Sequence, residues 1–272
     1  MNPTIPIENP NALFNFFEMS GPETAHMALK DVPHGRVEKV LYHSGSLNTE
    51  RRMNVYLPPN YEKRKGKLPV LYLLHAGGDN DISWTSAGKA NLILDNLYAE
   101  GKLKDMIVVM RSGHTPVRAT PMSGGLDMDP FYKDFLEDII PFIEKMYPVA
   151  TKRENRAIAG FSMGGVQTLN LALWHPEKFA YVCPMSTGYF PDGLKDIEEK
   201  YMDVLKNPVI NEFKLFVISM GKEDPILYKN CKTMMEIFDK AGIRYQYRET
   251  TGGHNFLVSR RSLLYNFPLL FR

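Results

Sequence analysis

Apolar residues fall along the chain in two alternating patterns, short continuous runs and helical stripes. The continuous runs have the length of strands that are buried on both faces, and they cover 69–74, 106–110, 157–161, 180–185 and 215–220. The helical stripes lie between and after them, at 87–100, 131–146, 166–174 and 227–241, and a last strand and helix follow at 243–248 and 256–265. Strands that alternate with helices predict an α/β fold in which helices cover both faces of a mostly parallel sheet.

The N-terminal part departs from this alternation. Two strand-like runs, 37–43 and 52–57, follow one another without a helix between them, which predicts an antiparallel N-terminal edge to the sheet. Residues 1–35 contain five prolines and are expected to form an irregular arm or the remnant of a linker. We therefore expect one domain at 36–272, preceded by this arm.

Two later segments interrupt the pattern. Residues 111–129 lack periodicity and are long for a loop in a compact domain, which is typical of functional or disordered segments. Residues 189–212 contain an amphipathic stretch between two core strands. A small cap over a site and a surface excursion both fit this second segment, and each of the two segments is a candidate lid.

The most specific chemistry lies at one strand-to-helix junction. The sequence Gly160-Phe-Ser162-Met-Gly164 joins the run 157–161 to the helix 166–174. A serine on such a sharp turn needs small neighbours, and the turn lifts its hydroxyl above the sheet, beside the unpaired N–H groups of the helix start. The junction predicts that Ser162 is the nucleophile of a serine hydrolase, and the whole pattern is the α/β-hydrolase layout.

A serine nucleophile needs a base, and histidine, with an ordinary pKa of about 6.5, suits that task. Two histidines follow Ser162 in the chain. His175 ends the helix, whereas His254 comes after paired glycines directly behind the last strand, so His254 is the expected base. Asp224, after the preceding strand, is the expected orienting acid, with its neighbour Glu223 as the rival.

Acyl transfer also needs two backbone N–H donors for the oxyanion. Met163, the residue after the nucleophile, is expected to supply one of them. The other is expected from the loop that starts at His75, where Gly77 is the first choice and Gly78 the second, because glycine lets a substrate oxygen approach the main chain. His75 itself is expected to be structural.

Composition and motifs exclude several other classes. The 272 residues carry a net charge of +2, and no apolar run reaches membrane-spanning length, so nothing indicates a nucleic-acid or membrane partner. No His-Glu-x-x-His motif or glycine-rich phosphate loop is present, and no metal or organic cofactor is expected. Cys183 and Cys231 are expected to be buried and unbridged, and the N-terminus shows no signal peptide.

Several motifs, in the order found here, resemble the feruloyl esterase and esterase D branch of the α/β-hydrolases, carbohydrate esterase family 1. The resemblance rests on residues 31–35, 51–59, 73–79 with Trp84, 88–91, 94–96, 160–165, 221–224 and 252–254. It implies a carboxylic ester hydrolase that forms an acyl-serine and releases hydroxycinnamic acids from feruloylated plant polysaccharide, in a secreted or periplasmic setting. The alternatives are an acetyl-xylan or other short-acyl esterase or thioesterase, an acyltransferase, and a non-catalytic carbohydrate-binding relative.

Four aromatic side chains are candidate contacts for a phenolic acid or a sugar. Trp84, Tyr189 and Phe190 fit an aromatic platform, and ordinary packing explains each of them equally well. Members of this family often carry an aromatic residue after the histidine, and Phe256 occupies that place. The family's usual His-Gly-x-Gly reads His75-Ala-Gly-Gly here, which adds one methyl group beside Gly77.

Overall fold

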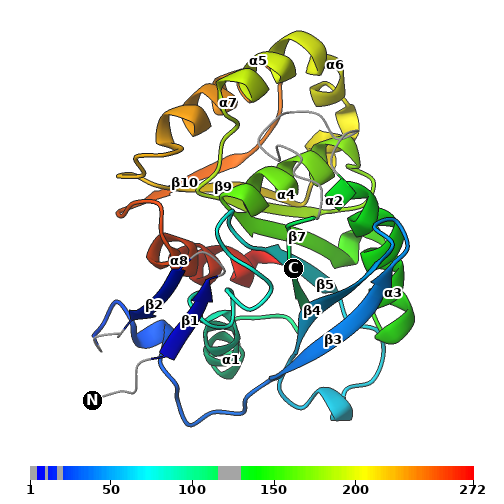
Figure 1. Cartoon of the computed structure of the whole chain (residues 1–272), viewed down its shortest axis with the longest axis vertical. Helices are drawn as coiled ribbons and strands as arrows, with labels where there is room; N and C mark the ends of the chain where they lie inside the picture. The colour runs from blue at the N-terminus through cyan, green and yellow to red at the C-terminus, as the bar shows by residue number, and fades with distance from the viewer. Residues whose placement is uncertain (1–4, 10–11, 17–20, 116–129) are drawn as a thin grey trace.

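The computed structural model describes residues 5–9, 12–16, 21–115 and 130–272. Its centre is an eight-stranded sheet in the order β10-β9-β8-β7-β5-β6-β4-β3 (Figure 1). The strands of this sheet are β3 Arg36–Ser44, β4 Thr49–Leu57, β5 Val70–Leu74, β6 Ile107–Arg111, β7 Arg156–Phe161, β8 Tyr181–Met185, β9 Leu215–Gly221 and β10 Gln246–Thr250. The pairs from β6 to β10 are parallel, whereas β3 with β4 and β4 with β6 are antiparallel. The predicted parallel sheet with an antiparallel N-terminal edge is confirmed.

Helices cover both faces of the sheet, as predicted (Figure 1). The α-helices are α1 Ala90–Ala99, α2 Pro130–Lys133, α3 Ile140–Met146, α4 Met163–Trp174, α5 Pro191–Lys200, α6 Met202–Leu205, α7 Tyr228–Ala241 and α8 Phe256–Asn266. Short 3-10 helices are η1 Ala25–Met27, η2 Tyr61–Lys63, η4 Arg153–Asn155, η5 Pro208–Glu212 and η6 Phe267–Leu269. Helices α2, α3, α4 and α7 pack with one core cluster, and α1 and α8 pack with the other.

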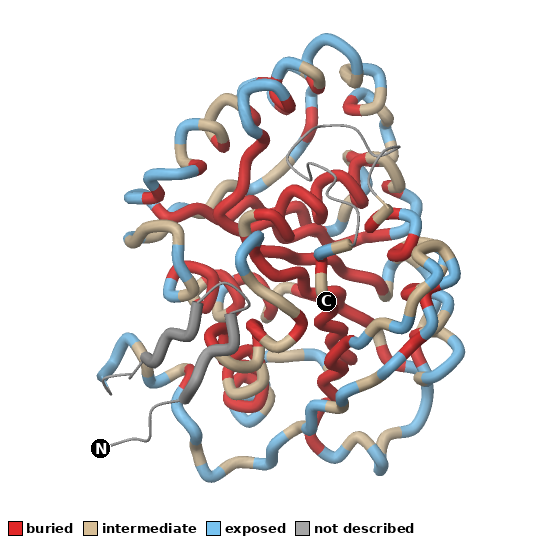
Figure 2. Tube along the Cα trace, in the orientation of Figure 1, coloured by how far each residue is buried: buried red, intermediate tan, exposed pale blue. Residues whose placement is uncertain are grey.

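Strand β5 shows how the two core clusters share the sheet. Its side chains alternate, so that Tyr72 and Leu74 join the cluster on the α4 face while Leu71 and Leu73 join the cluster on the α1 face. All of them are fully buried, which explains why the sequence reads as a continuous apolar run. Figure 2 shows the same burial along the strands at the centre of the molecule.

The helix predicted over 131–146 is interrupted. A π-helical turn, η3 Asp134–Ile139, separates α2 from α3, and the N–H of Ile140 donates to the carbonyl of Phe135. Pro141 lies at the start of α3 and has no N–H to donate. A proline inside a helical stripe therefore ends one regular segment and starts another, which the apolar periodicity alone does not reveal.

The last strand starts later than predicted. The apolar pattern begins at Ile243, but β10 begins at Gln246, where the chain pairs with Val217 of β9. Ile243 is 5% exposed and belongs to the core cluster on the α7 face, so its apolar character reflects packing before the strand begins.

Two segments outside the main sheet have regular structure. The arm at 1–35 was expected to be irregular, and this is wrong for part of it, because β1 Ile5–Asn9 and β2 Ala12–Phe16 form an antiparallel pair. Residues 189–212 form α5, α6 and η5, and Leu194, Ile197 and Leu205 bury against the core on the face of α4 and α7. This segment thus adds to the helical layer of that face. No helix in the described ranges is long and apolar enough to cross a bilayer.

Candidate active site

Ser162 lies at the sharp turn between β7 and α4, as the sequence predicts. Its backbone has φ 56° and ψ −113°, and the positive φ is uncommon for a residue with a side chain. The Ser162 N–H donates to the Met185 carbonyl at 2.9 Å, and the Ser162 carbonyl accepts from the Val166 N–H at 3.0 Å. These contacts, one to β8 and one within α4, hold the strained conformation on which the position of the hydroxyl depends.

Two glycines beside Ser162 are required by close backbone approach. A Cβ at Gly164 would lie 2.6 Å from the carbonyl oxygens of both His75 and Leu74, and a Cβ at Gly160 would overlap the Gly164 carbonyl. The start of α4 therefore sits directly against the ends of β5 and β7. The predicted reason for these glycines, lack of space at the turn, is confirmed.

Ser162, His254 and Asp224 meet although they come from three separate loops. Ser162 Oγ lies 2.8 Å from His254 Nε2, and His254 Nδ1 lies 2.6 Å from Asp224 Oδ2. The Asp224 side chain is fully buried and that of His254 is 14% exposed. The carboxylate accepts from Nδ1–H, which leaves Nε2 free to accept the serine proton.

The Asp224 carboxylate is stabilised in its charged form. Its second oxygen, Oδ1, accepts from the N–H groups of Ile226 and Leu227, both at 2.9 Å. Burial by itself raises the pKa of Asp224, but the hydrogen bonds from His254 and from these two N–H groups outweigh it and hold the pKa below its usual value. The carboxyl group therefore stays ionised beside the imidazole at neutral pH.

Glu223, the rival acid, has a different contact. Its carboxylate accepts a hydrogen bond from the N–H of Gly252, and its own N–H donates to the Gly252 carbonyl at 3.1 Å. The structure thus brings Asp224 to the imidazole of His254. It brings Glu223 to the backbone of the loop that carries His254. Adjacent carboxylates in the sequence do not reveal this division, because it depends on which way each side chain leaves the turn.

The two expected oxyanion donors lie close together. A Cβ at Gly77 would be 3.7 Å from the Met163 Cβ, so the loop after β5 touches the start of α4 at this point. The Gly164 N–H donates to the His75 carbonyl at 3.0 Å, which ties the two segments to one another. Met163 is the first residue of α4, and a helix start leaves such N–H groups without intrahelical acceptors.

His75 is structural, as expected. Its Nδ1 lies 2.7 Å from the Ala76 carbonyl, and its Nε2 accepts from the Gly113 N–H at 2.7 Å. Burial lowers the pKa of His75 to about 3, so the ring is neutral at physiological pH and accepts through Nε2. The ring thereby links the end of β5 to the segment that follows β6.

Two polar residues near the site were not among the sequence predictions. Gln167, on α4, is fully buried and donates through Nε2 to the Gly113 carbonyl at 3.0 Å. Asp79 closes a turn with the Ala76 carbonyl at 3.1 Å, and burial raises the pKa of its carboxyl to about 6. In the sequence, the signal that Asp79 lies near the site was its position two residues after Gly77, an expected oxyanion donor.

For two members of the candidate aromatic platform, Trp84 and Tyr189, the alternative of ordinary packing holds, whereas Phe190 is 44% exposed. Trp84 is 1% exposed and donates through its indole N–H to the Leu74 carbonyl at 2.9 Å. Tyr189 is fully buried and donates to Asn170 Oδ1 at 2.7 Å. Both are core residues, because each aromatic ring is packed and its polar atom has a partner inside the protein.

Phe256 is half-buried and lies between the core and the site. Its ring is 5.5 Å from that of Trp84 and 5.4 Å from that of Phe161, both edge-to-face. The Phe161 ring lies 4.9 Å from the imidazole of His254. Phe256 is therefore a candidate whose ring contacts lead to the site. Most of the candidate lid 111–129, namely residues 116–129, lies outside the described residues.

The sequence predicts neither a metal site nor a disulfide. In the ranges 5–9, 12–16, 21–115 and 130–272, no three histidine, cysteine or acidic side chains gather as metal ligands would. Cys183 and Cys231 are both free and buried, as expected. Burial raises the pKa of both thiols to about 12, so they remain protonated.

The parallel sheet with its antiparallel edge, the strained serine turn and the Ser–His–Asp contact define an α/β-hydrolase. The Esterase family model matches residues 44–207, which is more than half of the chain. The chain belongs to this esterase family. Its sequence motifs also resemble those of feruloyl esterases.

Curated relatives include enzymes with xylan-related names. The chain is 36% identical over 241 residues to an endo-1,4-beta-xylanase/feruloyl esterase of Xylanibacter ruminicola, covering 86% of this chain and 31% of that protein. It is 29% identical over 239 residues to endo-1,4-beta-xylanase Y of Acetivibrio thermocellus, covering 83% of this chain and 21% of that protein. The chain thus spans less than a third of the length of either relative.

Solved structures agree with this placement. A ferulic acid esterase superposes with a TM-score of 0.76 at 26% identity, covering 88% of this chain and 99% of the other. A feruloyl esterase module from Clostridium thermocellum, complexed with sinapinate, has the same TM-score of 0.76 at 22% identity, with 100% and 97% covered. The fold is therefore that of feruloyl esterases, and the family is one of carboxylic ester hydrolases.

Proposed function

We propose that this protein is a serine carboxylic ester hydrolase that releases hydroxycinnamic acids, ferulic acid among them, from acylated plant cell-wall xylan. The observation that carries the catalytic part is the contact of His254 with Ser162 Oγ at 2.8 Å on one side and with Asp224 at 2.6 Å on the other. A base between a nucleophile and an orienting carboxylate is the arrangement that activates a serine hydroxyl.

In the first half of the reaction, Ser162 Oγ attacks the ester carbonyl carbon while His254 Nε2 takes the hydroxyl proton. Asp224 keeps the imidazole oriented and stabilises the imidazolium that forms. The N–H groups of Met163 and Gly77 donate to the carbonyl oxygen as it becomes an oxyanion. The tetrahedral intermediate then collapses, and the sugar oxygen leaves with the proton from His254.

In the second half, a water molecule attacks the acyl-serine while His254 takes one of its protons. The same N–H pair stabilises the second oxyanion. Collapse of this intermediate breaks the bond to Ser162 Oγ, which regains its proton from His254, and the carboxylic acid is released. Water and ester are consumed, acid and alcohol are formed, and the protein returns to its starting state.

The substrate part of the proposal is supported by the relatives. Both curated relatives described above bear xylanase names, and one of them also bears the name feruloyl esterase. The half-buried Phe256 contacts Phe161 edge-to-face, and the Phe161 ring lies against the imidazole of His254, so Phe256 offers an apolar surface near the reacting atoms. Because plant cell walls lie outside microbial cells, this substrate implies a secreted or periplasmic location.

Hydrolysis rates on methyl ferulate, methyl coumarate and an aryl acetate, measured side by side for the wild type and Ser162→Ala, test the proposal. We expect turnover of the hydroxycinnamate esters, and a loss of at least about 10⁴-fold in Ser162→Ala, because the nucleophile is gone. Thermal unfolding of the variant should match the wild type. Retained turnover in Ser162→Ala would contradict the catalytic assignment, and a strong preference for the acetate would favour a short-acyl esterase.

A further inference from the structure

The loop 251–255, which carries His254, is held by side chains that the catalytic steps do not use. On one side, Glu223 binds the Gly252 N–H, as described above. On the other side, Arg261 of α8 donates through Nη1 to the Thr251 carbonyl at 2.6 Å and to the Thr251 hydroxyl at 3.3 Å. The loop is thus tied both to the turn that carries the acid and to the helix that follows the histidine.

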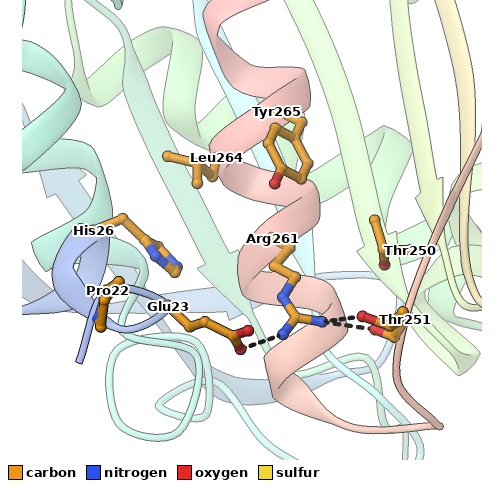
Figure 3. A pocket seen from close by; sticks show the side chains of 8 residues that line it. All are labelled: Pro22, Glu23, His26, Thr250, Thr251, Arg261, Leu264 and Tyr265. Atoms are coloured by element: carbon orange, nitrogen blue, oxygen red, sulfur yellow. Dashed lines mark hydrogen bonds and ion pairs between the residues drawn. The ribbon is translucent and has the colours of Figure 1, made fainter. Parts of the chain in front are cut away.

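Figure 3 shows Arg261 between Glu23 and Thr251. All three residues line a cavity of about 320 Å³. Arg261 Nη2 also pairs with Glu23 at 2.9 Å, but the Glu23 side chain is 82% exposed, so this ion pair is expected to contribute little. The Arg261 side chain is only 20% exposed. The contact with Thr251 is therefore the one through which the guanidinium acts on the structure.

The loop needs external anchors because its own sequence is flexible. Gly252 has a φ of 115°, which residues with a side chain rarely adopt. A Cβ at this position would lie 2.7 Å from Val258 Cγ2. Gly253 follows directly, so two residues without side chains precede His254. Glycine loses more conformational freedom on ordering than any other residue, and contacts from outside must offset that loss.

We propose that Arg261 is a positioning residue that keeps His254 within reach of Ser162 by tying the Thr251 carbonyl to α8. The inference rests on the proposed function, in which His254 takes the serine proton. Without this tie the loop populates conformations in which Nε2 is out of reach, and kcat falls with the fraction of competent molecules. The groups that bind the ester are unchanged, so KM is expected to change little.

The first test is Arg261→Ala, assayed with an aryl ester. We expect kcat to fall roughly 10- to 100-fold, the scale on which a misplacement of about 1 Å acts, while KM stays within about twofold. Labelling of Ser162 by a fluorophosphonate should slow in parallel. Because the cavity adjoins the space that the Arg261 side chain leaves, millimolar guanidinium should restore part of kcat in a saturable manner. Urea, which has a similar shape but no charge, should not restore kcat.

Two variants serve as matched controls. Glu23→Gln removes the charge of the exposed partner of Arg261 and leaves Arg261 in place. Arg244→Ala removes another arginine, which lies on the segment before β10. Arg244 also donates to a main-chain carbonyl, that of Asn211, at 2.7 Å. Both should stay within about twofold of the wild type, since neither anchors the loop 251–255. If Arg261→Ala does not fold, Arg261→Met keeps the apolar stem and should show the same loss of kcat.

A wild-type kcat in a folded Arg261→Ala or Arg261→Met overturns the inference, and so does a loss of kcat that guanidinium leaves unchanged. The two proposals fail in different ways. A wild-type protein without ester turnover contradicts the proposed function, whereas wild-type turnover that Arg261→Ala retains in full contradicts this inference alone.

Discussion

The two sides of the contact between Ser162 and His254 are built by different means. The serine turn is held by main-chain hydrogen bonds and by glycines that let backbones touch: the Ser162 N–H binds the Met185 carbonyl, and a Cβ at Gly164 would meet two carbonyl oxygens at 2.6 Å. The histidine loop has one main-chain bond to the turn that carries the acid, from the Glu223 N–H to the Gly252 carbonyl, and its other anchors are side chains. Asp224 binds the imidazole itself, and Glu223 and Arg261 bind the neighbouring backbone.

This difference predicts how each side fails. A turn held mainly by its main chain is damaged most by added bulk, because its glycines leave no room for a Cβ, although the Thr187 hydroxyl also donates to the Ser162 carbonyl at 3.0 Å. A loop held by side chains is damaged by the loss of a single polar group, because each group has a distinct partner. The first kind of support leaves a motif in the sequence, and the second leaves residues that are far apart and look ordinary.

The largest effect is expected from Asp224→Asn, which removes the charge but keeps the shape of the side chain. The imidazolium then lacks its counter-charge and the preferred tautomer changes, so kcat should fall by about 10³- to 10⁴-fold. The matched control is Glu223→Gln, which keeps an acceptor for the Gly252 N–H and should lose only a few-fold. Kinetics on an aryl acetate measure both, and equal losses would show that the two acids share one role.

A smaller effect, on stability, is expected from Gly160→Ala in the serine turn. The added methyl group would overlap the Gly164 carbonyl, and the free energy of unfolding should fall by about 1–3 kcal/mol. Gly21→Ala is the control, because a Cβ there meets nothing within 4 Å. Denaturant unfolding of both variants gives the comparison. A Gly160→Ala protein as stable as the wild type would mean that the turn is not closely packed.

The smallest effect concerns Asp79, on the loop next to both sides of the site. Burial raises its folded-state pKa to about 6 from an ordinary value of 3.8, so the folded protein binds more protons than the unfolded chain between these values. The free energy of unfolding therefore falls as pH rises through this window. Asp79→Asn removes the charge, and it should be more stable than the wild type above about pH 6 by about 1 kcal/mol, after allowance for partial exposure.

Thermal unfolding of wild type and Asp79→Asn between about pH 4 and pH 8 checks this sign. The two curves should converge near pH 4, where the wild-type carboxyl is protonated in the folded state. A stability difference that is the same at every pH would indicate a lost hydrogen bond and not a titrating carboxyl group.

Most of the fold could be predicted from the sequence because its signals are local. The apolar runs and helical stripes depend on neighbouring residues, and so do the glycines around Ser162. The start of β10 and the π-helical turn before Pro141 were missed for a physical reason. An apolar residue such as Ile243 is buried whether it lies in a strand or before one, and a proline changes hydrogen bonding without changing the apolar stripe.

The site could be predicted in part. The order of Ser162, Asp224 and His254 along the chain, each after a strand, was sufficient to nominate them. The sequence favoured Asp224 over its rival Glu223 but did not reveal the contact that each makes, because both follow β9 and only their side-chain directions differ. It also suggested that Trp84 faces substrate, because residue type and distance along the chain do not say which side of a loop a ring occupies.

The buried Trp84 gives the enzyme an internal optical probe. Its indole binds the end of β5, from which the loop with Gly77 continues, and its ring touches Phe256. The chain has only one other tryptophan, Trp174, at the far end of α4. In a protein with Trp174→Phe, tryptophan emission would come from the single indole that contacts Phe256, so acylation of the serine could be followed in real time without a coloured substrate.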